Sequence, residues 1–129
     1  MLRSALLELF SGPEWRVLGL AASAEDALQA LPALRPDLVL VDVSLPGMSG
    51  LKLVERLCVQ RPTLKTLMVS GHSETLYARA ALSAGACGFV TKDDPDQLLD
   101  AVRTVLNGET FVSERLRAAL DDPDELDNE

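Results

Sequence analysis

The stretch DLVLVDVSLPGMSG, residues 37–50, runs from a continuous apolar segment into a single acid and then into a sharp turn. The acid is Asp42, and the turn is marked by Pro46, Gly47 and Gly50. A charge buried without a partner is costly, so an acid that ends a buried strand is normally paired, metal-bound or placed at the strand's open end. The residues around Asp42 therefore decide which of these three explanations applies.

Further apolar stretches alternate with helical patterns along the chain. The sequence predicts strands at 15–22, 37–43, 64–70 and 87–91, and helices at 2–10, 23–34, 49–60, 73–85 and 95–108. Ser23 is placed to cap the second helix, and Gly85 and Gly108 are placed to end the last two. Continuously apolar strands separated by helices are typical of a parallel sheet with both faces covered. The sequence thus predicts an α/β fold.

Three polar residues stand at or just after the carboxyl ends of different predicted strands, namely Asp42, Ser70 and Lys92. Parallel sheets place their functional groups in the crevice beyond these ends, so we expect the three side chains to converge. Phosphoryl transfer requires a nucleophilic oxygen, donors to the equatorial oxygens and positive charge. An acid, a hydroxyl and an ammonium group meet these needs. Taken singly, each is more often a turn former or a solvated side chain.

Length and composition indicate one ordinary globular domain. The 129 residues are 47% hydrophobic and 25% charged, and no apolar run approaches the ~20 residues of a membrane helix. The N-terminal segment contains Glu8 and lacks a small-residue cleavage site, which favours a helix over a signal peptide. Cys58 and Cys87 have neither metal-site nor redox-motif spacing and are expected to be reduced, buried thiols of a cytoplasmic protein.

The net charge of −8 is concentrated at the C-terminus. The last nine residues, DDPDELDNE, hold six acids and no base. Such a run is usually solvated, so we expect residues 1–116 to form the domain and residues 117–129 a disordered acidic tail. The sequence contains no basic footprint of the kind that nucleic-acid binders carry. Direct binding of nucleic acid is not expected.

These motifs together identify the sequence as similar to the receiver domain of two-component response regulators. The matching stretches are PDLVLVDVSLPGMSGLKLVERL (36–57), TLMVSGHSE (66–74), ALSAGACGFVTKD (81–93) and DQLLDAVRTVLNGE (96–109). The resemblance implies a flavodoxin-like fold, a doubly wound parallel sheet with strand order 2-1-3-4-5. Lys92-Asp93 and VLNGE (105–109) resemble most the subfamily that usually carries a C-terminal helix-turn-helix.

The resemblance also implies roles for individual residues. Asp42 would be the phosphoacceptor, Lys92 would pair with the aspartate or its phosphoryl oxygen, and Ser70 would be the switch hydroxyl. The Gly71 amide would lie near the phosphoryl group, and Phe89 would be the aromatic side chain whose rotamer follows Ser70.

Mg²⁺ is the cofactor that the resemblance implies, with Asp42 and the backbone carbonyl of Ser44 as ligands. Pro46 and Gly50 would shape the loop that holds the site open.

One part of the family pattern is not matched. The family's first strand, which ends in two acids that help to bind magnesium, has no counterpart in this sequence. The sheet is therefore expected to lack its central first strand, between 15–22 and 37–43, and magnesium binding is expected to be weak. Three explanations are open: a misassigned or truncated start, direct pairing of the flanking strands, or completion by a second chain.

Two functions are weighed for this chain. The first is a receiver that accepts a phosphoryl group on Asp42 from a sensor histidine kinase or phosphotransfer protein and switches a face of its last helices for a downstream protein. The second is a degenerate receiver that acts as a phosphorylation-independent interaction module. A flavin-binding protein would need a hydroxyl- and glycine-rich phosphate loop, which is not seen. We expect a non-enzymatic, cytoplasmic domain without membrane contact, with homodimerisation as one way of covering exposed strand edges.

Overall fold

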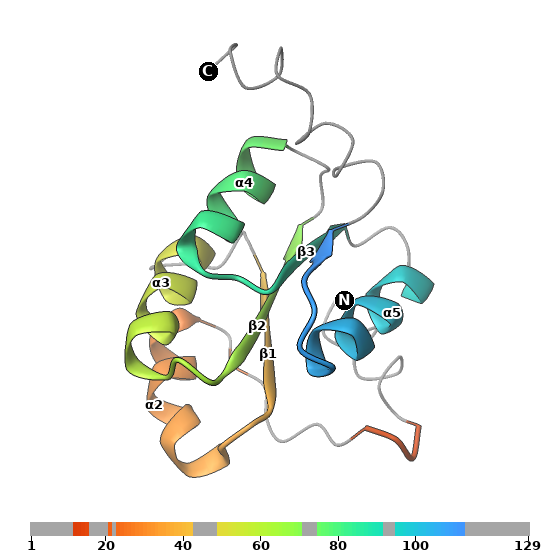
Figure 1. Cartoon of the computed structure of the whole chain (residues 1–129). Coiled ribbons are helices and arrows are strands. Elements are labelled where there is room, and N and C mark those ends of the chain that lie inside the picture. The colour runs from red at the N-terminus through yellow and green to blue at the C-terminus, as the bar shows by residue number, and fades with distance from the viewer. Residues whose placement is uncertain are drawn as a thin grey trace.

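Four parallel strands and the helices between them make up the described part of the molecule. The computed structural model describes residues 12–15, 21, 23–42, 49–70, 75–91 and 95–112 (Figure 1). The elements are α2 (Ala24–Leu34), β1 (Leu38–Asp42), α3 (Gly50–Gln60), β2 (Lys65–Ser70), α4 (Thr75–Ala84), β3 (Gly88–Thr91), α5 (Pro95–Leu106) and β4 (Phe111–Val112). The alternation of strands and helices that the apolar pattern predicts from residue 23 onward is confirmed.

The strands follow one another in the sheet in the order β1-β2-β3-β4, and every neighbouring pair is parallel. Asp42 at the end of β1 is the register partner of Val69, and Ser70 at the end of β2 is the partner of Thr91. All strand carboxyl ends therefore lie along one edge of the sheet, as the α/β prediction requires.

Helices cover the sheet on both sides, which is the doubly wound arrangement. Figure 1 shows α2, α3 and α4 on one face and α5 on the other. Because side chains alternate along a strand, Met68 joins a buried cluster with residues of α2, α3 and α4, whereas Leu67 and Val69 join a second cluster with α5. All three side chains are at most 3% exposed.

Local signals set the helix ends. The Ser23 hydroxyl oxygen accepts a hydrogen bond from the Asp26 amide at 3.1 Å, which confirms the predicted cap of α2. Helix α4 is followed by Gly85 with φ of 110°, and α5 by Gly108 with φ of 91°. These left-handed values favour glycine, so both predicted stops are confirmed.

Strand β4 is an element that the sequence analysis does not predict. The Phe111 amide donates to the Cys87 carbonyl at 3.0 Å, and Phe111 and Val112 pair with Gly88 and Phe89. A Cβ at Gly88 would lie 2.6 Å from the Phe111 carbonyl oxygen and 2.7 Å from Leu67 Cδ1. The absence of a side chain at this position is what allows β4 to pair with β3.

A polar cluster holds the segment before the predicted first strand against α5. Arg103 Nη2 donates to Glu14 Oε1 at 2.7 Å, and the Arg103 guanidinium lies 5.5 Å from the centroid of the Trp15 ring. The hydrogen bond to Glu14 is the main cause of the raised pKa of Arg103. Trp15 packs against the cluster on the α5 side, as does the half-buried Cys87. Cys58 is exposed, so the expected burial of both thiols is wrong.

Several expectations fall outside the described residues. They are the helix at 2–10, most of the strand at 15–22 and the acidic tail at 117–129. The gap expected beside the strand at 37–43 falls there too, because the strand that would flank it is not described. These expectations remain predictions.

We expect Gly88→Ala to lower the free energy of unfolding by about 1–3 kcal/mol, because the new methyl group must displace Leu67 or the β4 backbone. Chemical denaturation would measure it as a lower midpoint at an unchanged slope. Ser83→Ala, at an exposed position of α4, is the control and should change stability by less than about 0.5 kcal/mol. Equal stability of both variants would contradict the close approach of β4.

Candidate functional site

Asp42 and Ser70 end neighbouring strands at the carboxyl edge of the sheet. Asp42 is the last residue of β1 and is half-buried, and Ser70 is the last residue of β2 and is 4% exposed. The register partner of Asp42 is Val69, so Ser70 is one residue further along the adjacent strand. Since neighbouring strands lie about 4.8 Å apart, the backbones of these two residues lie close to one another at this edge, and the meeting of their side chains remains a prediction.

The third strand contributes the next position along this edge. Thr91 is the last residue of β3, is the register partner of Ser70, and is 9% exposed. Lys92 follows it directly in the chain but lies outside the described residues, as do Gly71 and Ser44. The predicted meeting of Lys92 with Asp42 and Ser70 thus remains a prediction.

Thr91 is a residue of this edge that the sequence analysis does not single out. It places a second nearly buried hydroxyl beside that of Ser70. Its position directly before Lys92 was visible in the sequence. What could not be read there was the register, which aligns Thr91 with Ser70.

Phe89 lies inside the molecule, on the sheet face that it shares with Ser70. Its side chain is 0% exposed and belongs to the cluster formed with α2, α3 and α4. Met68 is its register partner, and Met68 and Ser70 are two positions apart on β2. Phe89 is therefore a diagonal cross-strand neighbour of Ser70.

Gly50 lets helix α3 begin against the end of β1. A Cβ at Gly50 would lie 2.6 Å from the carbonyl oxygen of Asp42 and 2.9 Å from Met68 Cε. The Ser49 hydroxyl oxygen caps the helix by accepting from the Lys52 amide at 3.2 Å. Gly50 is the first residue of α3, inside the predicted helix at 49–60, and lack of space, rather than a left-handed φ, explains the glycine. Its expected part in shaping the loop before α3 remains a prediction, because residues 43–48 lie outside the described residues. Pro46 lies outside the described residues.

Carboxylates are sparse at this edge within the described ranges. No three His, Cys, Asp or Glu side chains come together there as a metal-binding group. In this part of the molecule Asp42 is thus not joined by two further ligands of these types. Its carboxylate is of the oxygen type that Mg²⁺ prefers, and Mg²⁺ usually binds through one or two carboxylates together with phosphate and water.

Comparison with known proteins places this geometry among signalling domains. A family model described as the response regulator receiver domain matches residues 1–103. The transcriptional activator protein ExaE of Pseudomonas putida is 44% identical over 101 residues, which cover 78% of this chain and 47% of that protein. The nitrate/nitrite response regulator protein NarL of Escherichia coli K12 is 35% identical over 124 residues, covering 93% of this chain and 56% of that protein.

Solved structures agree with the sequence relatives. A two-component response regulator of the LuxR family from Aurantimonas sp. SI85-9A1 matches with a TM-score of 0.88 and 28% identity, over 99% of this chain and 91% of that one. The chain spans about half the length of the curated relatives it matches. The subfamily expected from the motifs is confirmed.

We expect Gly50→Ala to destabilise the protein by about 1–3 kcal/mol, because the added methyl group would meet the Asp42 carbonyl. The sign is informative, since alanine normally stabilises a helix by about 0.5–1 kcal/mol relative to glycine. Gly12→Ala is the matched control, because its Cβ would meet nothing closer than Trp15 Cδ1 at 4.0 Å. A Gly50→Ala protein as stable as the Gly12→Ala protein in urea would contradict the close approach.

Proposed function

The chain belongs to the response regulator receiver domain family, and we propose that it accepts a phosphoryl group on Asp42 within two-component signal transduction. The observation that supports this role is the position of Asp42 at the carboxyl edge of the sheet, where Ser70 ends the next strand. In the sequence, Lys92 directly follows Thr91, the last residue of β3. An acid, a hydroxyl and a cation at one edge suit an anion carried on the carboxylate.

The reaction is a transfer between two covalent carriers. An Asp42 carboxylate oxygen attacks the phosphorus of a phosphohistidine, the P–O bond forms as the P–N bond breaks, and the bonding electron pair returns to the imidazole nitrogen. The product is an aspartyl phosphate on this chain. Ser70, the Gly71 amide and Lys92 supply donors and positive charge to the phosphoryl oxygens. The chain is thus an acceptor rather than an enzyme that turns over a free substrate.

Phosphorylation would be transmitted through Ser70 to Phe89. A hydroxyl that moves toward the phosphoryl group changes the space on the sheet face where the Phe89 ring packs. A phosphoryl group shifts such an equilibrium only by as much as it binds the two states differently. Helices α4 and α5, which contact β3, are the elements from which a downstream protein would sense the change.

Magnesium would be held by the Asp42 carboxylate and the Ser44 carbonyl. When bound, Mg²⁺ would offset the negative charge that gathers on the phosphoryl oxygens. The described residues offer no group of three His, Cys, Asp or Glu side chains for it. Because Asp42 would supply a single carboxylate and Ser44 only an uncharged carbonyl, we propose that magnesium binding by this chain is weak and that phosphorylation depends little on it.

Partners follow from this role. A sensor histidine kinase or a phosphotransfer protein would donate the phosphoryl group, and a downstream protein would bind the last helices. ExaE is a transcriptional activator, and by that likeness the chain would serve as the input part of a transcriptional regulator. The net charge of −8 argues against DNA contact by these residues themselves. We also propose a cytoplasmic location and the formation of a homodimer. Separately, none of the described helices has the length and apolar character needed to span a bilayer.

We expect a small phosphodonor such as acetyl phosphate to label the chain slowly, with little change on addition of Mg²⁺. Asp42→Asn should abolish labelling because it removes the nucleophilic oxygen. Asp37→Asn, an exposed acid near the other end of β1, is the matched control and should be labelled like the unmodified chain. Intact-mass spectrometry reports the added phosphoryl group in each case. Labelling of Asp42→Asn at the unmodified rate would assign the phosphoryl group elsewhere.

Ser70→Ala should slow labelling by about 100-fold without abolishing it, because one of several donors to the phosphoryl oxygens is lost. Circular dichroism must show the variant folded. An unchanged rate would remove Ser70 from the site. If the unmodified chain is labelled by no donor, including a phosphorylated kinase, the phosphorylation-independent interaction module becomes the better description.

A further inference from the structure

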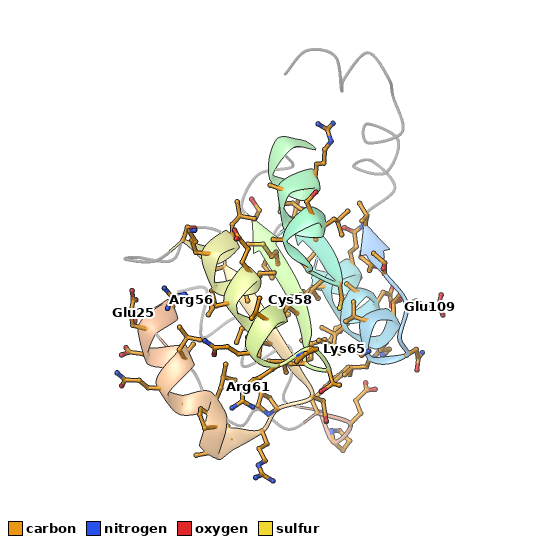
Figure 2. All side chains as sticks on the ribbon, turned by 60° about the vertical axis from the view of Figure 1, so that its left-hand side comes forward. Glu25, Arg56, Cys58, Arg61, Lys65 and Glu109 are labelled. Atoms are coloured by element: carbon orange, nitrogen blue, oxygen red, sulfur yellow. The ribbon has the colours of Figure 1, made fainter. Side chains whose placement is uncertain are left out.

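A hollow of about 730 Å³ lies at the end of the sheet opposite Asp42. It is formed where α2 leads into β1 and where α3 leads into β2, with the last turn of α5 beside them. We call this site the basic hollow. Its lining includes Arg35, Asp37, Arg61, Leu64, Lys65 and Leu106. Figure 2 shows Arg61 and Lys65 at the same end of the molecule.

Three cations surround the basic hollow in a chain of net charge −8. Arg35 is exposed, and Arg61 and Lys65 are half-buried. Within the described part of the chain none of the three forms an ion pair. Asp37, exposed, is the one acid among the lining residues. The hollow is therefore a local positive site on an acidic protein and suits an anionic ligand.

Arg35 occupies a position where glycine would be easier. It caps α2 in the left-handed conformation, with φ of 49° and ψ of 57°, and its amide donates to the Leu31 carbonyl at 3.0 Å. Helices commonly end with glycine in this conformation, because a Cβ is disfavoured there. A strained residue of this kind is compatible with a use for its side chain.

We propose that the acidic segment 121–129 of this chain docks in the basic hollow. The segment carries six acids and no base, and one leucine, Leu126, lies between Glu125 and Asp127. The hollow offers cations and also apolar surface, since it is lined by Leu64 and by Leu106, which is 39% exposed. Charge and apolar character therefore match on both sides.

The chain is long enough for this contact. Leu106 lines the hollow and precedes the last described residue, Val112, by six residues, so the hollow is at most about 22 Å from Val112. Residue 121 follows Val112 by nine residues, which span up to about 30 Å when extended. A tether of this length keeps the segment at a local concentration in the millimolar range, so weak contacts are enough to hold it.

Docking would leave the phosphoryl site open, because the hollow lies where β1 and β2 begin and Asp42 and Ser70 lie where these strands end. The proposal does not depend on phosphorylation of Asp42. Contacts between exposed charges are screened by salt, so the segment would be docked at low ionic strength and solvated at high ionic strength. An acidic segment of a partner protein would compete for the same cations.

Paramagnetic relaxation enhancement on the full chain tests the proposal. A nitroxide is attached through Asn128→Cys in a background with Cys58→Ser and Cys87→Ser, which keeps every acid of the segment. At about 20 mM salt we expect the amide signals of Arg35, Asp37, Arg61 and Lys65 to lose about half or more of their intensity, and at about 1 M salt to recover it. The signals of Asp42 and Ser70 should be unaffected.

Charge reversal separates docking from a general charge effect. Arg35→Glu with Arg61→Glu should remove the loss of signal, whereas Lys52→Glu with Arg56→Glu should leave it intact. The control changes the net charge equally, at two exposed positions of α3 that do not line the hollow. Arg35→Gly is a second test that relieves the left-handed strain, so it should weaken docking with the melting temperature unchanged or raised.

Loss of signal at the hollow that depends on salt and on Arg35 and Arg61 supports the proposal. Loss confined to other surfaces, or unchanged by the reversal at Arg35 and Arg61, overturns it. A mixture of isotope-labelled chain and spin-labelled, isotope-free chain gives the last decision, because signal loss in that mixture would mean that the segment docks on a second copy and not on its own chain.

Discussion

The structure depends on the burial of β2 between two layers of helices. Parallel strands bury well only when both faces are covered, because each face carries apolar side chains. Leu67 and Val69 face α5, and Met68 faces α3 and α4, while β1 and β3 bond to the strand's two edges. The backbone groups of β2 are thus paired in a region that water does not reach, which such burial requires. Strands β1 and β3 are positioned by their hydrogen bonds to β2.

This constraint also creates the site. Once parallel strands are aligned around β2, their carboxyl ends share one edge, and the residues that end them are brought together from distant parts of the sequence. The same alignment requires α3 to begin close to the end of β1, which explains why Gly50 has no room for a side chain beside the Asp42 carbonyl. The partial burial of Asp42 and the burial of Ser70 follow from this packing.

The two ends of the sheet differ in chemistry. At the carboxyl end stand Asp42, Ser70 and Thr91, which suit a group carried on an aspartate. At the other end the connections from α2 to β1 and from α3 to β2 bring Arg35, Arg61 and Lys65 around one hollow. The proposed phosphoryl site and the basic hollow are thereby separated by the length of the strands. A ligand in the basic hollow would therefore leave Asp42 accessible.

The sequence by itself determined the class of fold and the position of Asp42 at the end of a strand. The apolar runs around Val41 and Met68, the cap at Ser23 and the stop at Gly85 act locally, and each is visible without knowing the neighbours. Only the tertiary structure decided the register that aligns Thr91 with Ser70, the pairing of Phe111 with Gly88, and the gathering of Arg35, Arg61 and Lys65. These contacts join residues far apart in the chain, and their free energies depend on the space left by other elements. No local pattern carries that information.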